Sequence, residues 1–425
     1  MPYLCYNKIQ DGTVMESVTA KHKSKKKDYG RPPGRLLYSV ARFILRVVFK
    51  PYFHLEWTVD PAIRDLPMPL IVLGNHPSYI DPFFIGCALY PMKINFLASS
   101  IFFRNKYFEP LLYRAGVIPK TQFRADPGAI KSMLKVVRRN GILGIFPEGA
   151  RSIDGTGLPI EDSIAKFIKK VGGAVVVGIS KGAYFTWPRW SESGFRKGKI
   201  QIDINILFTK DDVAVMSAEE MQAKILDKFS FDENVWQKTQ MIPFRSKAPA
   251  KGLHTILHQC PSCRKSWILD TTETTLFCTN CGNTAIMDLY GFLNPKDTTS
   301  VVFKTIREWN LWQIDNISKD ISTGNYSLSD EAELFISRNE EQFSPSGNGV
   351  ISLDKEGFLF KGVFNGEGLI KAFPLPGVLG IISDYGKNIA LVSDQFTFLF
   401  VLKNGQKAVS FNHAREILHS NVHPG

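Results

Sequence analysis

The sequence predicts an α/β domain, followed by a small four-cysteine module and a β-rich C-terminal region. Strand-like and helix-like segments alternate between residues 69 and 230, two CxxC pairs lie within residues 260–281, and short β-type runs recur after residue 349. A chain of 425 residues is too long for one ordinary domain, and about 150 residues per domain gives two to three. Hydrophobic residues at 44% and charged residues at 22% exclude a largely disordered, collagen-like or coiled-coil chain.

The positive charge is concentrated near the N-terminus. The net charge is +12, and residues 1–50 contain eleven Lys or Arg against three acids, which gives +8. We interpret residues 1–29 as a basic flexible tail whose cluster runs from Lys21 to Lys27. A basic end on a nearly balanced body indicates a polyanionic partner, either the anionic face of a membrane or a nucleic acid, and a nuclear-localisation role also stays open.

Residues 30–55 are predicted to form an amphipathic helix in a membrane interface. At about 100° per residue, Arg42, Arg46 and Lys50 share one stripe, and the large apolar side chains lie outside it. The lysine cluster adds about 1 kcal/mol of attraction to anionic lipid for each basic residue near the surface. The alternative is a surface helix packed on the protein's own core, and both can hold if one flank packs inward.

Two absences bear on the expected location. No apolar run reaches the roughly 18 to 20 residues needed to cross a bilayer. No apolar core with a small-residue cleavage site, which would mark a secretory signal peptide, is visible at the N-terminus. The expected location is therefore cytoplasmic, peripheral at the inner face of the membrane.

A first candidate catalytic pair follows a predicted strand. Residues 69–81 read PLIVLGNHPSYID, an apolar run that ends in a polar loop and meets Asp81-Pro82, a helix-start signal. His76 and Asp81 lie five residues apart, so the carboxylate can hold the imidazole tautomer while the other ring nitrogen faces outward. Such a histidine is a candidate general base. The alternative is that Asp81 only caps the helix over about 82–89 and His76 is only a loop residue.

A second candidate site follows the next predicted helix and strand. Asp126-Pro127 opens a helix with apolar residues at i, i+3, i+4 and i+7, and a buried strand over 142–146 leads into FPEGARS at 146–152. Open α/β sheets place ligands at such turns, where strands end. Arg151 can bind a phosphate or carboxylate through two hydrogen bonds, and Glu148 can hold a hydroxyl. Alternatively, the two side chains form a structural ion pair.

Two later segments complete the α/β pattern. A strand over residues 199–207 has isoleucine at alternate positions, and Ser217 with Glu220 forms a capping box that begins a helix. Strands that alternate with helices indicate an α/β sandwich for this region.

The two motifs together resemble the glycerolipid acyltransferase family, which includes the 1-acyl-glycerol-3-phosphate acyltransferases. The family's HxxxxD motif falls on His76 and Asp81 within NHPSYIDP, and its FPEG motif falls on residues 146–149. The resemblance covers roughly residues 30–245. It implies an acyltransferase domain over residues 56–248, with a mixed sheet and flanking helices.

The resemblance also implies a reaction. His76 would deprotonate a glycerol-backbone hydroxyl, which attacks an acyl thioester directly, and Asp81 would orient His76 and stabilise its charged form. Glu148, Gly149 and Arg151 would position a phosphorylated acceptor. The expected reaction moves a fatty acyl group from acyl-CoA or an acyl-carrier protein to a lysophospholipid, with 1-acyl-glycerol-3-phosphate as the expected acceptor and phosphatidate as product. It requires no metal and no covalent acyl-enzyme.

The sequence departs from the family in the blocks that read the acceptor. The usual Thr before the motif arginine is Ala150, the usual Lys after Ala98 is Ser99, and a valine replaces the usual proline of the block at 174–179. The replacement cations that we consider are Lys120, Arg124 and Arg104. Ser78 inside the first motif is an alternative nucleophile, although nothing in its setting indicates an elbow-type serine.

Four of the six cysteines form two pairs, CPSC at Cys260 and Cys263 and CTNC at Cys278 and Cys281. This spacing predicts a zinc ribbon over residues 255–290, in which four thiolates complete the tetrahedral shell of a structural Zn²⁺. Disulfides, a redox CxxC and rubredoxin-like iron are the alternatives. Zinc ribbons often bind nucleic acids or proteins, which gives a second hypothesis for function.

Residues 291–425 are predicted to form a β-rich accessory domain. Strand-like runs lie at 350–353, 358–360, 378–383, 389–392, 396–402 and 408–411, and Asn404-Gly405 predicts a hairpin between the last two. A helical end follows at 414–419, and residues 316–348 are expected to form loops around short elements. The pattern is loosely similar to pleckstrin-homology or GRAM-type domains, and a plain accessory β domain is the alternative.

The paired motifs favour an enzyme over a nucleic-acid-binding protein built on the basic tail and the zinc ribbon. A nucleic-acid reader does not need both motifs at strand ends, and Arg264 and Lys265 are offset by Asp270 and Glu273. We therefore expect a lysophospholipid, an acyl thioester and an anionic membrane surface as partners, and no nucleic acid. A lipid-binding protein on the acyltransferase fold, without turnover, is the remaining alternative.

Overall fold

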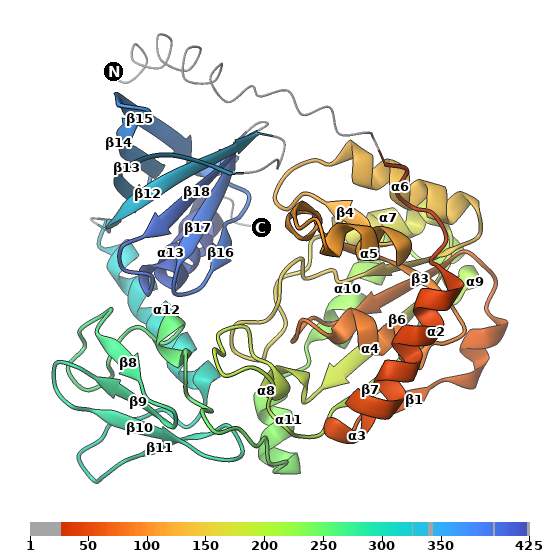
Figure 1. The fold of residues 1–425 in the computed structure, drawn as a ribbon, viewed down its shortest axis with the longest axis horizontal. Coiled ribbons are helices and arrows are strands. Elements are labelled where there is room, and N and C mark those ends of the chain that lie inside the picture. Colours follow the sequence, from red (N-terminus) through yellow and green to blue (C-terminus); the bar gives the residue numbers. More distant parts are fainter. Residues whose placement is uncertain (1–26, 325, 339–342, 394–395, 423–425) are drawn as a thin grey trace.

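The computed structural model describes residues 27–324, 326–338, 343–393 and 396–422. Figure 1 shows an α/β domain, a small sheet and a larger C-terminal sheet, with helix α12 (Ile306–Ser322) running between the two sheets. The basic cluster up to Lys26, and Cys5, lie outside the described residues. The basic tail over 1–29 therefore stays a prediction.

Seven strands of the α/β domain form one mixed sheet in the order β1-β7-β6-β2-β5-β3-β4. The strands β2 to β6 run parallel to one another, whereas β7 is antiparallel to β6 and pairs in parallel with β1. The predicted mixed sheet is thus confirmed. The bounds are β1 Glu56–Val59, β2 Leu70–Gly74, β3 Ile94–Ser99, β4 Ile118–Lys120, β5 Ile142–Ile145, β6 Ala174–Lys181 and β7 Gln201–Phe208.

Helices connect these strands. Asp126 caps α6 by accepting the Ala129 N–H, and Ser217 and Glu220 form the capping box of α10, so both predicted helix starts are confirmed. The longer helices are α2 Arg35–Ile44, α4 Asp81–Ala88, α5 Phe108–Arg114, α6 Pro127–Arg138, α7 Ser163–Val171, α9 Lys210–Val215, α10 Ala218–Phe229 and α11 Glu233–Gln240. The short ones are η1 Leu45–Phe49, α3 Lys50–Tyr52, η2 Pro61–Asp65, η3 Ser100–Arg104, α8 Ala183–Thr186 and η4 Leu253–Thr255.

The sheet is covered on both faces because its central strand is apolar on both sides. In β2, Leu70 and Val72 belong to the core shared with η1 and α4, whereas Ile71 and Leu73 belong to the core shared with α6, α7 and α10. A strand buried on both faces is a continuous apolar run rather than an alternating one. The domain is therefore a three-layer α/β/α sandwich, as the sequence predicts.

The predicted N-terminal helix is present as α2, η1 and α3, and it packs by one flank only. Leu45 is fully buried in the core, whereas Leu36 and Phe43 are 79% and 67% exposed. Arg42 stacks on the ring of Tyr90. Val40, Ile44, Val47, Val48 and Tyr52 are exposed as well. One flank packs inward while an apolar flank stays uncovered.

The four-cysteine module is a four-stranded antiparallel sheet in the order β11-β10-β9-β8. Its strands are β8 Leu269–Thr271, β9 Thr275–Cys278, β10 Thr284–Met287 and β11 Leu293–Pro295, so the sheet extends five residues past the predicted boundary at 290. Trp309 of α12 is buried in the same core as the module strands. The module is therefore packed against α12.

The C-terminal region is a seven-stranded antiparallel sheet in the order β15-β14-β13-β12-β18-β17-β16, with one helix at its end. Its elements are β12 Leu328–Arg338, β13 Ser344–Asp354, β14 Gly357–Phe364, β15 Glu367–Pro374, η5 Leu375–Gly377, β16 Ile382–Asp384, β17 Asn388–Ser393, β18 Phe396–Leu402 and α13 Lys407–Val422. This agrees with the expected small β domain closed by one helix. The expectation of loops over 316–348 is wrong, because that stretch contains the end of α12, all of β12 and the start of β13.

The predicted hairpin at Asn404-Gly405 and strand at 408–411 are also wrong. The segment turns into α13, and Asn404 Oδ1 accepts the Gln406 N–H at the start of the helix. Ala408, Phe411 and Leu418 are buried in the C-terminal core at helical spacing. A four-residue segment with three apolar residues fits a strand or a buried helix equally well, and only the continuation to Leu418 distinguishes them. The strand predicted over 378–383 is reduced to β16.

Candidate active site

The candidate residues gather at the carboxyl edge of the parallel strands. His76 follows β2, Glu148 follows β5 and Lys120 ends β4. Loops at this edge of an open α/β sheet form its ligand-binding surface. The fold therefore brings together motifs that are about seventy residues apart in sequence.

His76 and Asp81 form a hydrogen-bonded pair. His76 Nδ1 lies 3.0 Å from Asp81 Oδ2, and the same oxygen accepts the Ser78 N–H at 2.8 Å. Asp81 is fully buried, whereas 21% of the His76 side chain is exposed. The contact orients the imidazole through Nδ1 and leaves Nε2 as the nitrogen that can meet a substrate proton.

Asp81 does not cap a helix, contrary to the alternative considered from sequence. Helix α4 begins at Asp81 itself, its N-cap residue is Ile80, and no side-chain cap is formed. The carboxylate turns back toward the motif loop instead. Ser78 Oγ is buried and has no hydrogen-bond partner among the described residues, so no base activates it as a nucleophile.

Burial and two nearby cations keep His76 neutral. Desolvation, followed by the positive charges of Arg151 and Arg189, lowers the pKa of His76 to about 3. The exposed part of the ring tempers this shift, since water still solvates it. Desolvation also raises the pKa of Asp81 well above its ordinary value. A neutral imidazole is the form that can accept a proton.

Glu148 joins the two motif loops to each other. Its Oε1 accepts the His76 N–H at 3.1 Å, and its Oε2 accepts the Leu158 N–H at 2.8 Å. The side chain is buried, and desolvation raises its pKa to about 7. Among the described residues Glu148 forms no ion pair with Arg151, so the structural ion pair considered as the alternative from sequence is not formed. Both oxygens are already used, which makes Glu148 a residue that positions the His76 loop.

Arg151 lies over an aromatic ring beside the pair. Its guanidinium carbon is 3.2 Å from the ring centroid of Tyr79, and its Nη1 is buried without a hydrogen-bond partner. Burial lowers the pKa of Arg151 to about 10, with a further contribution from Arg189. Gly149 has φ +67°, a left-handed backbone, and a Cβ there would meet no atom within 4 Å. Its conformation, rather than crowding, favours glycine at this turn.

The predicted replacement cations border this site on one side. Gln122 Nε2 donates to the Gly149 carbonyl at 2.9 Å, which places the loop with Lys120 and Arg124 next to the FPEG turn. Lys120 is exposed, and its Nζ donates to the neighbouring Thr121 carbonyl at 3.5 Å. Among the described residues, Lys120 forms no hydrogen bond with a motif residue. The role of these cations stays a prediction.

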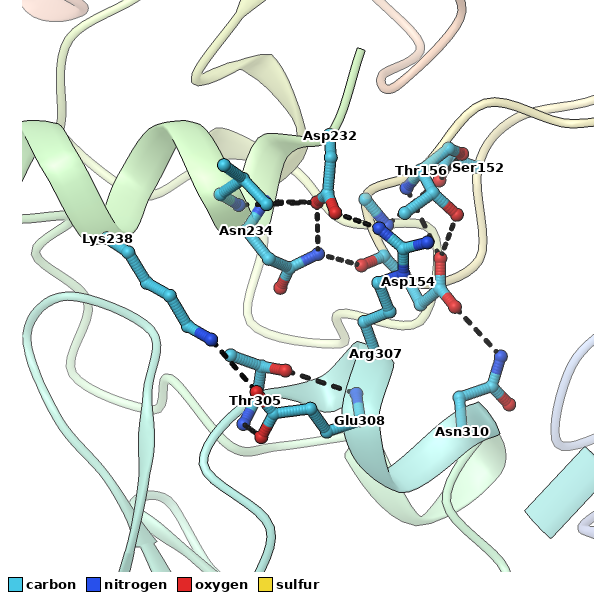
Figure 2. Close-up of polar contacts among 12 residues, drawn as sticks. Ser152, Asp154, Thr156, Asp232, Asn234, Lys238, Thr305, Arg307, Glu308 and Asn310 are labelled. Carbon is cyan, nitrogen blue, oxygen red and sulfur yellow. Dashed lines mark hydrogen bonds and ion pairs between the residues drawn. The ribbon is translucent and has the colours of Figure 1, made fainter. Parts of the chain in front are cut away.

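The loop that follows Arg151 is held from three directions. The Ser152 N–H donates to the His76 carbonyl at 3.1 Å, which ties the loop to His76. Asn234 of α11 donates to the Asp154 carbonyl at 2.8 Å, and Asn310 of α12 donates to Asp154 Oδ2 at 3.0 Å (Figure 2). Arg307 of α12 also pairs with Asp232 (Figure 2). Helix α12, outside the α/β domain, therefore supports the loop that carries Arg151.

Three site residues are missing from the sequence-based prediction. Tyr79 lies under Arg151, Arg189 acts electrostatically on both Arg151 and His76, and Tyr385 acts on Arg151 from the C-terminal domain. Tyr79 is inside the first motif and could have been considered from sequence. Arg189 and Tyr385 have no local signal, because they meet across 196 positions of chain.

The four module cysteines come together at one point. Their Sγ atoms all lie within 4.8 Å of one another, and the Cys260–Cys281 and Cys263–Cys278 sulfurs are each 3.7 Å apart. Thiolates bound to tetrahedral Zn²⁺ at about 2.3 Å stand roughly 3.8 Å from one another. These distances exceed the roughly 2.05 Å of a disulfide. The residues therefore fit a closed tetrahedral metal site.

Comparisons with known proteins concern the α/β domain. The profile of a family described as Acyltransferase matches residues 62–180. A 1-acyl-sn-glycerol-3-phosphate acyltransferase of Bacillus subtilis (strain 168) is 25% identical over 157 residues, which are 37% of this chain and 75% of that protein. The crystal structure of the 1-acyl-sn-glycerophosphate (LPA) acyltransferase PlsC from Thermotoga maritima is similar with a TM-score of 0.39 at 18% identity, covering 48% of this chain and 79% of that one.

Proposed function

Residues 62–180 form an acyltransferase domain of the glycerolipid acyltransferase family, and from this premise we propose which acyl transfer the protein performs. It moves a fatty acyl group from an acyl thioester to the free hydroxyl of 1-acyl-glycerol-3-phosphate, and the product is phosphatidate. The observation that most supports this proposal is the His76–Asp81 pair at the strand edge, with Arg151 beside it.

The reaction proceeds by general base catalysis at His76. Nε2 removes the proton of the acceptor hydroxyl while the oxygen attacks the thioester carbonyl carbon, and the C–S bond then breaks. The imidazolium returns its proton to the leaving thiolate. Asp81, 3.0 Å from Nδ1, orients the ring and stabilises the imidazolium that forms in between. No residue of the chain needs to be acylated.

The other motif residues position the substrate and the base. Arg151 binds the phosphate of the acceptor, since a guanidinium forms charge-assisted hydrogen bonds with a phosphate. Glu148 fixes the His76 loop through its contact with the His76 N–H. The acyl donor is acyl-CoA or an acyl-carrier protein.

We further propose that the protein works at the inner face of the membrane, bound peripherally. The exposed apolar flank of α2 and η1, which includes Leu36 and Phe43, supports this because such side chains gain by entering the lipid interface. Arg46 and Lys50 on the same helix supply attraction to anionic lipid. Across the described residues, no helix combines the length and apolarity required to span a bilayer.

The cysteine module binds one structural Zn²⁺ in this proposal. Cys260, Cys263, Cys278 and Cys281 supply all four thiolates, so no position is left for a substrate. The metal holds the module together, and the module packs against α12, which supports the Arg151 loop. The ion therefore acts on fold and not on the reacting groups.

The proposal is tested by acyl transfer to 1-acyl-glycerol-3-phosphate on anionic vesicles. His76→Ala is expected to lower kcat by about 10²- to 10⁴-fold, which is the usual contribution of a general base. His54→Asn serves as the matched control, because His54 is exposed, lies outside the site and has a φ of 42° that asparagine tolerates. The proposal fails if the wild type transfers no acyl group, or if His76→Ala transfers it at the same rate as His54→Asn.

A further inference from the structure

Two guanidinium groups lie near the candidate base, and only one belongs to a motif. Arg189 follows α8 in the loop after β6, and its positive charge lowers the pKa of both His76 and Arg151. A chain of ring contacts links the two arginines. Arg151 stacks on Tyr79, and the Tyr79 ring lies 5.0 Å from the ring of Trp187, two residues before Arg189. The loops that carry Arg151 and Arg189 therefore meet through Tyr79 and Trp187, and both arginines act on His76.

Neither arginine is neutralised by a carboxylate among the described residues. No ion pair of Arg151 or Arg189 occurs there, and Arg151 Nη1 is buried with no hydrogen-bond partner. The two acids of the motifs are occupied: Asp81 contacts His76 and Ser78, and both oxygens of Glu148 accept backbone N–H groups. Two like charges that share a largely desolvated site repel each other, and an uncompensated buried donor is costly. Such a pair is stabilised when an anion binds between them.

The C-terminal domain holds Arg189 in place. Arg189 Nη1 donates to the Tyr385 hydroxyl at 3.4 Å, its guanidinium carbon lies 4.2 Å from the Tyr385 ring centroid, and Nη2 donates to the Ser383 carbonyl. Ser383 belongs to β16 and Tyr385 follows it, on the side of the C-terminal sheet nearest the α/β domain (Figure 1). Tyr385 is buried at this contact.

The C-terminal domain also packs on the segment after β3, where it contacts Arg104 and Phe123. Phe343 lies under the guanidinium of Arg104 at 4.4 Å, and Gly380 approaches Phe123 so closely that a Cβ would lie 2.2 Å from its ring. Phe123 is next to Gln122, which contacts the Gly149 carbonyl. The C-terminal domain therefore borders the acceptor side of the site at three separate points, including Arg189.

We propose that Arg151 and Arg189 together form a binding subsite for a phosphate monoester, with Arg189 held in position by Tyr385 and Ser383 of the C-terminal domain. The inference rests on the proposed acyl transfer, and it adds a second phosphate-binding residue and a role for the C-terminal domain. A phosphate monoester is dianionic near neutral pH and has three acceptor oxygens, which suits two guanidinium groups. Its source is either the acceptor headgroup or the 3′-phosphate of coenzyme A.

The subsite also couples phosphate binding to the base. The two guanidinium charges lower the pKa of His76, so a dianion bound between them offsets that effect and raises the basicity of the ring. The titratable groups that act on Arg151 are Arg189, Tyr79, Tyr385 and Asp81. A substrate with a phosphate monoester thus activates the base that will use it, and a substrate without one does not.

Steady-state kinetics of Arg189→Gln tests the subsite with four substrates. The acceptors are 1-acyl-glycerol-3-phosphate and uncharged 1-acyl-glycerol, and the donors are acyl-CoA and acyl-pantetheine, which lacks the 3′-phosphate. We expect Arg189→Gln to raise KM by about 10- to 100-fold only for the substrate whose phosphate monoester occupies the subsite. This is the effect of losing a charge-assisted hydrogen bond. Arg189→Lys should recover part of this, and Arg138→Gln, an exposed arginine of α6, should change nothing.

The outcomes separate the sources and the hypotheses. An increase confined to 1-acyl-glycerol-3-phosphate assigns the subsite to the acceptor, and one confined to acyl-CoA assigns it to the donor. An equal loss with charged and uncharged substrates overturns the subsite, and so does an unchanged KM for all four. If the wild type catalyses no transfer, calorimetric titration with glycerol 3-phosphate still decides: binding that Arg189→Gln weakens about tenfold supports the subsite, and equal binding or none overturns it.

Discussion

Replacing Asn310 by alanine tests whether helix α12 supports the loop that carries Arg151. Asn310 is 2% exposed, its Nδ2 donates to Asp154 Oδ2 at 3.0 Å, and its Oδ1 accepts a hydrogen bond from His413 Nε2 at 3.0 Å. Asn310→Ala leaves both buried partners without this contact, and each costs about 1–3 kcal/mol. Only the Asp154 contact holds the loop over residues 148–158, so the expected loss in the free energy that keeps this loop closed is about 1–3 kcal/mol.

Hydrogen exchange of the backbone amides in that loop measures this free energy. At 1.36 kcal/mol for each tenfold change, the protection factors should fall by roughly 5- to 160-fold, and the KM for the phosphorylated acceptor should rise. Asn316→Ala is the matched control, because Asn316 lies on the same helix and donates to Gln259 Oε1 at 2.7 Å, away from the loop. Unchanged exchange at residues 148–158 in Asn310→Ala, or equal changes in both variants, would refute the support by α12.

Three further outcomes follow from the same contacts. Purified protein should hold one Zn²⁺ per chain by metal analysis, and Cys263→Ser should lose it; a metal-free, folded wild type would contradict the proposed site. Burial lowers the pKa of His258 in the folded protein to about 3, whereas a histidine in the unfolded chain has its ordinary pKa of about 6.5. Because the unfolded chain binds the proton first, the free energy of unfolding should fall as the pH drops from 6.5 toward 3. The loss is about 2 kcal/mol at pH 5. Denaturation at pH 7 and pH 5 should show this loss in the wild type and a smaller one in His258→Phe. Phe43→Asp with Val47→Asp should weaken binding to anionic vesicles at least about tenfold, whereas Val235→Asp, exposed on α11, should not.

Much of the α/β domain can be predicted because its signals are local. A continuous apolar run gives β2, Asp126 before a proline gives the start of α6, and the Ser217–Glu220 capping box gives α10. Each depends on residues within one turn or one strand. The sheet order is not local, and it places the ends of β2 and β5 side by side through the pairing of their backbones.

The C-terminal domain shows where such signals fail. The strand β12 alternates buried and exposed positions, with Asp330 buried and Glu331 and Glu333 exposed. These acidic residues give the segment the composition of a loop. There, Asp330 is satisfied by Lys407 and by the Asn404 N–H. The same contacts begin α13 where the Asn-Gly pair predicts a hairpin. Contacts between residues more than seventy positions apart therefore determine both the strand β12 and the start of α13.

In the candidate site, too, some contacts can be predicted from local sequence and others cannot. His76 and Asp81 are five residues apart, so their contact is predictable from a loop before a helix. The Glu148 contact with the His76 N–H already needs the fold, and it changes the expected role of Glu148 from holding a substrate hydroxyl to positioning the base. The contact of Arg189 with Tyr385 joins two domains, and no pattern in the sequence indicates it.

The measurement that tests the central claim most directly is a single-turnover reaction with labelled acyl thioester and 1-acyl-glycerol-3-phosphate on anionic vesicles, with the label traced by mass spectrometry. The account predicts labelled phosphatidate with the wild type, no labelled protein, and no phosphatidate with His76→Gln. Labelled enzyme that forms before product would contradict direct transfer. Phosphatidate formed equally by His76→Gln would contradict the assignment of His76 as the base.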